Sequence, residues 1–81
     1  MEKEIVVLDV LGLNCPLPVM KARKALARMH TGEVLKVAAT DPMSAIDIPH
    51  MCNEDGHTLV SLLKDGDVRY FVIKRGVTAG E

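Results

Sequence analysis

The sequence predicts an α/β (α+β) fold, a two-layer sandwich in which two helices cover one face of a four-stranded mixed sheet. Segments rich in β-branched residues alternate with segments of helical apolar spacing, in the order β-α-β-α-β-β. The chain has 81 residues, which suits one small domain with a single core. It is 48% hydrophobic but contains one Phe, one Tyr and no Trp, so we expect an aliphatic core.

The first strand and the first helix follow directly from the residue pattern. Residues 4–10, EIVVLDV, form a short segment rich in β-branched residues, which predicts a strand that ends at the loop around Gly12. From Leu17 to about His30, spacings of three and four predict a helix with one buried stripe: Val19, Ala22, Leu26 and Met29. Gly32 is the expected C-terminal cap of this helix.

A second strand and a second helix come next. Alternation in residues 34–40, VLKVAAT, predicts a strand with three residues on one face: Leu35, Val37 and Ala39. Asp41 at the N-cap and Pro42 at the first helical position predict the start of a helix. The helix continues through MSAIDIPHMCN, where we expect Pro49 to kink or split it.

The last two strands are predicted to form a hairpin. HTLVSLLK and VRYFVIK are joined around Asp65-Gly66, a favoured hairpin turn. A right-handed strand-helix-strand crossover would place both helices on one face of the sheet. The apolar residues of the open face are interpreted as ordinary surface rather than as a docking surface: Ile5, Val7, Tyr70 and Val72. We expect a single domain over residues 1–76 and a flexible tail over residues 77–81.

Charge and hydropathy exclude several classes of function. Ten basic and eleven acidic residues leave a net charge of -1, which gives no global attraction to phosphate backbones or anionic membranes. No segment approaches the roughly 20 apolar residues of a membrane span. The run IVVLDVLGL lacks the basic start of a secretory signal. The sequence therefore predicts a cytoplasmic protein with no membrane partner, in which Cys15 and Cys52 are free thiols.

Cys15 is the candidate nucleophile. It stands before Pro16, at or beside the N-cap of the first helix, where the helix dipole is expected to lower the pKa of the thiol. Pro16 and Pro18 stiffen the backbone that carries the sulfur, and Asn14 is available to cap the helix. Lys21 and Arg23 would add positive potential, or they form a solvated helix face. The plainer alternative is a small buried residue filling the loop-helix junction.

The surrounding residues narrow the chemistry of this cysteine. All three histidines lie downstream of Cys15, so no general base is predicted beside it and a Cys-His protease pair is unsupported. A thiolate that needs no dedicated base, metal or cofactor suits thiol exchange or sulfur transfer. Cys52 follows Met51 in the second helix and is interpreted as an inert packed cysteine. His50, Cys52 and His57 form an incomplete metal-ligand set, so no metal site is predicted.

The stretch GLNCPLPVMKARKAL resembles the C-P-x-P signature of the TusA/SirA family of small sulfur-carrier proteins. ATDPMSAIDIPHMC followed by GHTL resembles the second half of that family, so the resemblance covers roughly Leu8 to Gly76. It implies the same two-layer sandwich. It also implies a sulfurtransferase-type carrier in which Cys15 accepts a sulfane sulfur as a persulfide, with Pro16 and Pro18 shaping the motif.

The resemblance also implies partners. The donor would be a cysteine desulfurase or another sulfane-sulfur donor, and a downstream acceptor protein would receive the sulfur. Such relays belong to tRNA thiolation, molybdenum cofactor enzymes or sulfur oxidation. Asn14 and Leu17 stand where the TusA proteins commonly have an arginine and often an acidic residue, which makes the approach to Cys15 more neutral and more apolar.

A nucleic-acid-binding or regulatory module is the alternative function. The first helix has a basic face, made of Lys21, Lys24 and Arg28, and small α/β sandwiches do bind RNA. Stacking platforms need aromatic residues, however, and the chain has only Tyr70 and Phe71. We therefore interpret the basic face as a docking surface for an acidic protein partner.

Overall fold

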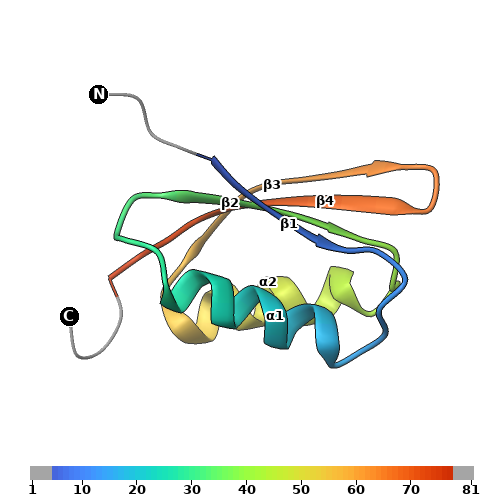
Figure 1. Ribbon diagram of the computed structural model, residues 1–81, viewed down its shortest axis with the longest axis horizontal. Helices are drawn as coiled ribbons and strands as arrows, with labels where there is room; N and C mark the ends of the chain where they lie inside the picture. Colours follow the sequence, from blue (N-terminus) through green and yellow to red (C-terminus); the bar gives the residue numbers. More distant parts are fainter. Residues whose placement is uncertain (1–4, 78–81) are drawn as a thin grey trace.

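The computed structural model describes residues 5–77 and confirms the predicted architecture. The elements are β1 (Ile5–Val10), α1 (Leu17–Ala27), β2 (Val34–Ala39), α2 (Ser44–Asp55), β3 (Thr58–Asp65) and β4 (Val68–Lys74). The sheet has the order β1-β2-β4-β3, in which β1 and β2 are parallel and the other pairs are antiparallel. Both helices pack on one face of this mixed sheet (Figure 1).

The core lies between the sheet and the two helices. Strand register aligns Leu8, Val37 and Phe71 across β1, β2 and β4, so their side chains share the face that the helices cover. Phe71 is fully buried and is the largest side chain of the core. The other members are aliphatic or sulfur-containing: Val10, Ala22, Leu26, Met29, Leu35, Val37, Ala39, Ile48, Met51, Cys52 and Ile73. The expected strand face of Leu35, Val37 and Ala39 is therefore confirmed.

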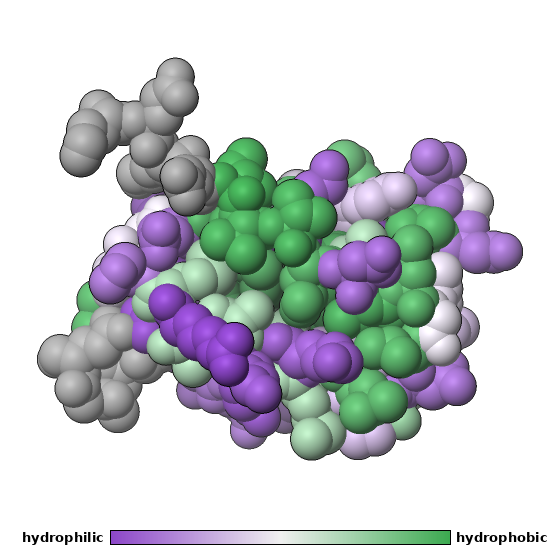
Figure 2. Space-filling model, viewed as in Figure 1, coloured by the Kyte–Doolittle hydropathy of each residue, from purple (hydrophilic) through white to green (hydrophobic). Residues whose placement is uncertain are grey.

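The opposite face of the sheet is open. Ile5 and Val7 of β1 are 61% and 68% exposed, and Figure 2 shows apolar surface over this edge strand. The Lys36 ammonium group lies 5.1 Å from the centre of the Tyr70 ring. Phe71, the other aromatic residue of the chain, is in the core, so at most the Tyr70 ring is available to stack on a base.

Helix α1 ends earlier than its apolar pattern predicts. It stops at Ala27 rather than near His30, and its C-cap residue is Arg28 rather than Gly32. The backbone N–H of Met29 donates to the Leu26 carbonyl at 3.1 Å, which tightens the last turn. Arg75 Nε donates to the same carbonyl at 2.8 Å, so a carbonyl at the end of the helix is hydrogen-bonded by a residue 49 positions away in the chain. Gly32 instead occupies a turn with φ of 90°.

Helix α2 begins two residues later than expected. Its N-cap residue is Met43, because Asp41 and Pro42 form a turn that precedes the helix. The Asp41 carboxylate accepts the Met43 N–H at 3.2 Å, and its carbonyl accepts the Ser44 N–H at 3.0 Å. Asp41 thus caps this turn rather than the helix itself. The helix is continuous through Pro49, so this proline does not split it.

The hairpin and the chain ends complete the fold. Asp65 pairs with Val68, so the two turn residues are Gly66 and Asp67, one position later than predicted. The expected tail lies outside the described residues from residue 78 onward, as does Glu4 of the predicted first strand. Among the described residues, no helix has the length and hydropathy to cross a membrane.

Candidate functional site at the ends of β1 and β2

Two loops meet where the parallel strands β1 and β2 end. The backbone N–H of Gly12 donates to Thr40 Oγ1 at 2.9 Å, and the backbone N–H of Cys15 donates to Asp41 Oδ2 at 2.6 Å. Thr40 and Asp41 directly follow β2, whereas Gly12 and Cys15 follow β1. These two hydrogen bonds hold the Cys15 backbone against the end of the neighbouring strand.

Cys15 adjoins the first turn of α1. The N-cap residue is Pro16, the Cys15–Pro16 peptide bond is cis, and Pro18 is buried at the start of the helix. The expectation that the Asn14 side chain caps α1 is wrong, because no side chain caps this helix. Instead the Asn14 carbonyl accepts the Leu17 N–H at 2.9 Å. The Cys15 side chain is exposed, which excludes the alternative of a buried packing residue.

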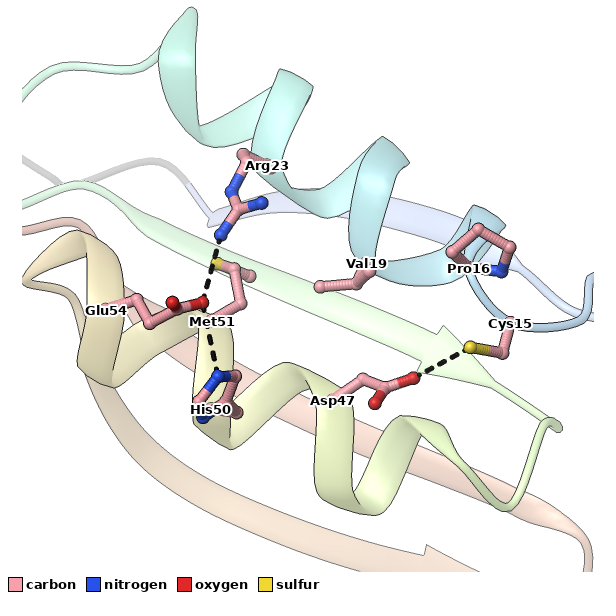
Figure 3. A pocket seen from close by; sticks show the side chains of 8 residues that line it. All are labelled: Cys15, Pro16, Val19, Arg23, Asp47, His50, Met51 and Glu54. Atoms are coloured by element: carbon pink, nitrogen blue, oxygen red, sulfur yellow. Dashed lines mark hydrogen bonds and ion pairs between the residues drawn. The ribbon is translucent and has the colours of Figure 1, made fainter.

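A groove of about 200 Å³ runs from Cys15 along the line between α1 and α2 (Figure 3). The two helices and the loop before α1 line it with side chains of mixed character: Cys15, Pro16, Val19, Arg23, Asp47, His50, Met51 and Glu54. The sulfur lies at one end, and Arg23 with Glu54 lies at the other. A partner that reaches Cys15 through this groove meets both apolar and charged groups.

The Cys15 thiol contacts the carboxylate of Asp47. Cys15 Sγ donates a hydrogen bond to Asp47 Oδ2 over 3.1 Å, and Figure 3 shows the two side chains pointing toward one another. This hydrogen bond, followed by partial desolvation and the negative charges of Asp47 and Asp41, raises the pKa of the Cys15 thiol. The expectation of a lowered pKa is therefore wrong. It took account of the adjacent helix terminus but not of these two carboxylates, which are distant in sequence.

The far end of the groove is an ion-pair cluster that joins the helices. Arg23 Nε contacts Asp55 Oδ2 at 2.6 Å, and Arg23 Nη2 lies 3.7 Å from Glu54 Oε1. His50 Nε2 lies 3.4 Å from the same Glu54 oxygen. The hydrogen bond to Asp55 raises the pKa of Arg23. Because its charge is paired here, Arg23 does not supply the expected positive potential at the sulfur.

The other candidate residues lie away from Cys15. Lys21, Lys24 and Arg28 are exposed on α1 but do not line the groove. Cys52 is only 2% exposed, and burial, followed by the charge of Asp55, raises its pKa to about 11.

The three residues of the incomplete metal set have separate surroundings. His50 faces Glu54, Cys52 is in the core, and His57 Nδ1 accepts the Gly76 N–H at 3.0 Å. Within residues 5–77, no group of three or more His, Cys, Asp or Glu side chains is placed to hold a metal ion.

Sequence reasoning missed the two acidic residues that contact Cys15. Asp47 and Asp41 lie 32 and 26 positions from Cys15 in the chain. One signal was present: in a parallel strand pair, the carboxyl ends of both strands lie at the same edge. The segments after β1 and β2 were therefore bound to meet, which places both aspartates among the candidates for contact with Cys15.

Comparisons with known proteins agree with this fold. A family model described as Sulfurtransferase TusA matches residues 6–75. The sulfur carrier protein TusA of Allochromatium vinosum is 43% identical over 68 residues, which cover 84% of this chain and 90% of that protein. The crystal structure of a SirA-like protein from Desulfitobacterium hafniense superposes with a TM-score of 0.78. The two sequences are 33% identical, and the superposition covers 91% of this chain and 100% of the SirA-like chain.

Proposed function

This chain belongs to the TusA family of sulfur carriers, and from that premise we propose that Cys15 accepts a sulfane sulfur as a persulfide and passes it to an acceptor protein. The observation that carries the proposal is the placement of Cys15. Its side chain is exposed, while its backbone N–H is fixed to Asp41 at 2.6 Å. A carrier needs this combination, because the sulfur must reach the active site of a partner from a defined position.

The second cysteine supports the assignment to Cys15. Cys52 is 2% exposed and packs in the core. A thiol that a partner cannot reach, and whose pKa is about 11, has little thiolate at neutral pH with which to attack a persulfide. Cys15 is therefore the proposed sulfur-bearing residue, with Pro16 and Pro18 shaping the turn that presents it.

The proposed partners are proteins. The donor is a cysteine desulfurase or another sulfane-sulfur donor, and the relay is of the tRNA thiolation, molybdenum cofactor or sulfur oxidation type. Apolar side chains flanking Cys15 and Asp47 in the sequence are exposed and suit a protein interface: Leu11, Leu17, Met43 and Ile46. The basic face of α1 would dock the acidic surface of a partner. The reaction needs free thiols, so the proposal includes a reducing, cytoplasmic setting.

Persulfide loading tests this function. The purified protein is incubated with a cysteine desulfurase and cysteine, and intact mass is measured before and after a reductant. We expect a gain of one sulfur that the reductant removes. Cys15→Ser should abolish the gain, whereas Cys52→Ser should keep it. Capture that is lost in Cys52→Ser and kept in Cys15→Ser would refute the assignment.

A further inference from the structure

We propose that Asp47 is a catalytic residue of this carrier: its carboxylate takes the proton from the Cys15 thiol as the sulfur attacks a persulfide, and returns it to the departing donor thiolate. This inference rests on the proposed function. It assigns the general base that the sequence lacks near Cys15, and it assigns it to a residue of the other helix.

The geometry singles out Asp47 among the acidic residues near the sulfur. Its Oδ2 lies 3.1 Å from Cys15 Sγ, which is within hydrogen-bond reach of the proton to be moved. Asp41, the other nearby carboxylate, already accepts two backbone N–H groups, those of Cys15 and Met43. Among residues 5–77, Cys15 is the side-chain partner of Asp47, so its carboxylate is committed to no other contact.

The charged groups around the sulfur explain why a base is needed. Asp47 from α2 and Asp41 from the loop before it face Cys15 and favour the neutral thiol. On the α1 side the groove has Arg23, whose charge is paired with Asp55 and Glu54. His50, the remaining titratable group of the groove, faces Glu54. No described cation offsets the two carboxylates, so Cys15 waits as a thiol and must lose its proton during the reaction.

The proposed step balances without a redox cofactor. The Cys15 S–H proton moves to Asp47 Oδ2 while Sγ forms a bond to the terminal sulfur of a donor persulfide, R–S–SH. The S–S bond of the donor breaks, and its electron pair leaves on the donor sulfur as R–S⁻. Asp47 then protonates this thiolate to give R–SH. The products are Cys15–S–SH and the donor thiol, so the donor persulfide is the only co-reactant.

Asp47→Asn separates this role from a purely electrostatic one. Two rates are measured from pH 6 to 10: alkylation of Cys15 by iodoacetamide, and persulfide loading by a small-molecule persulfide donor. Iodoacetamide reacts with the thiolate and iodide leaves without a proton, so alkylation does not depend on the return of the proton by Asp47. Removing the negative charge should raise the alkylation rate at neutral pH. Loss of the proton acceptor should lower the loading rate about tenfold or more, in the range of general-base effects.

The control variant is Asp67→Asn, which makes the same change in net charge in the hairpin turn between β3 and β4. It should leave both rates unchanged. Asp47→Glu keeps the carboxylate and should recover part of the loading rate. The loading rate of Asp47→Asn should approach that of the wild type at pH 10, because hydroxide ionises the thiol there without Asp47. Circular dichroism confirms that each variant is folded.

The possible outcomes distinguish a failure of this inference from a failure of the proposed function on which it rests. If Asp47→Asn raises loading together with alkylation, Asp47 only suppresses the thiolate and the inference is wrong, while the carrier function stands. Equal loading by wild type and Asp47→Asn would also show that the inference is wrong and would leave the carrier function in place. If the wild-type protein captures no sulfur on Cys15, the proposed function itself fails.

Discussion

The backbone N–H of Cys15 donates a 2.6 Å hydrogen bond to the buried carboxylate of Asp41, across the gap between the ends of β1 and β2. Asp41 also accepts the Met43 N–H, so one side chain orders both the loop that carries the thiol and the turn that leads into α2. The position of the sulfur therefore depends on a residue that binds the Cys15 backbone.

Replacing Asp41 should weaken both the fold and the site. Asp41→Ala leaves two backbone N–H groups without their partner, which should lower the free energy of unfolding by about 1–3 kcal/mol. Sulfur loading should slow as well, because the Cys15 loop loses its anchor. Urea unfolding and intact-mass kinetics measure the two effects. Asp67→Ala, in the hairpin turn, is the matched control. Unchanged loading in Asp41→Ala would show that the loop holds its shape without this bond.

Alkylation across pH should distinguish the two cysteines. Cys15 is exposed and should be modified first, but its rate should rise with a midpoint above that of an unperturbed cysteine, because the carboxylates of Asp47 and Asp41 raise its pKa. Cys52 should stay unmodified until the protein unfolds. Iodoacetamide labelling with peptide mapping measures both rates. A midpoint below the ordinary cysteine value would contradict the hydrogen bond to Asp47.

Stability should fall at alkaline pH because of Cys52. Burial raises its pKa to about 11 from an ordinary value of 9.0, so between these values the folded state binds the proton more tightly than the unfolded state. The stabilising contribution is complete below pH 9 and is lost as the pH rises toward 11, by up to roughly 2–3 kcal/mol. Urea unfolding at several pH values should show this decline. In Cys52→Ala, which is uniformly less stable, the same decline should be smaller.

The basic face of α1 should affect how fast a protein donor loads Cys15. Reversal of Lys21, Lys24 and Arg28 to Glu should slow loading by a cysteine desulfurase about tenfold at low salt and weaken the salt dependence of the rate. These side chains are exposed, so the fold should remain intact. The control reverses three cations of the hairpin: Lys64, Arg69 and Lys74. Equal loading by both triple variants would exclude a specific role for the basic face. Salt-sensitive RNA binding that only the α1 reversal removes would favour the nucleic-acid-binding alternative.

Gly76 should tolerate no side chain. A Cβ at this position would lie 1.8 Å from the Gly56 carbonyl oxygen, so Gly76→Ala forces the two backbone segments apart. We expect a loss of about 1–3 kcal/mol, or several degrees in the unfolding temperature. Thermal unfolding measures the change. Val77→Ala, at a position 68% exposed, should have little effect. An unchanged midpoint in Gly76→Ala would mean that the chain does not pass this close to the end of α2.

The predicted elements came from local features that a sequence displays directly. Alternation of Leu35, Val37 and Ala39 marks β2, and the spacing of Ala22 and Leu26 marks α1, whatever the rest of the chain does. The ends of the helices depend on distant residues. Arg75 binds the Leu26 carbonyl from 49 positions away, and no periodicity within α1 can show that contact.

The candidate site, like the fold, depends partly on local sequence features and partly on contacts between distant residues. The motif around Cys15 predicts the reactive thiol from a local pattern, a cysteine before Pro16 at a helix start. The direction of its pKa shift depends on Asp47, which reaches the sulfur only when α2 packs beside α1. The adjacent helix terminus therefore predicted the wrong direction for the pKa shift of Cys15, since only charges close to Cys15 in sequence were counted.

The hydrogen bond between Cys15 and Asp47 also bears on damage by oxidants. Peroxides attack the thiolate of cysteine, and the sulfenic acid that forms can proceed to sulfinic and sulfonic acids that cannot carry sulfur. Because the contact with Asp47 raises the pKa of the exposed Cys15 thiol, a molecule that has not met its partner should resist this loss even though solvent reaches the sulfur. If Cys15 carries sulfur as proposed, the contact should protect this accessible cysteine between one delivery and the next.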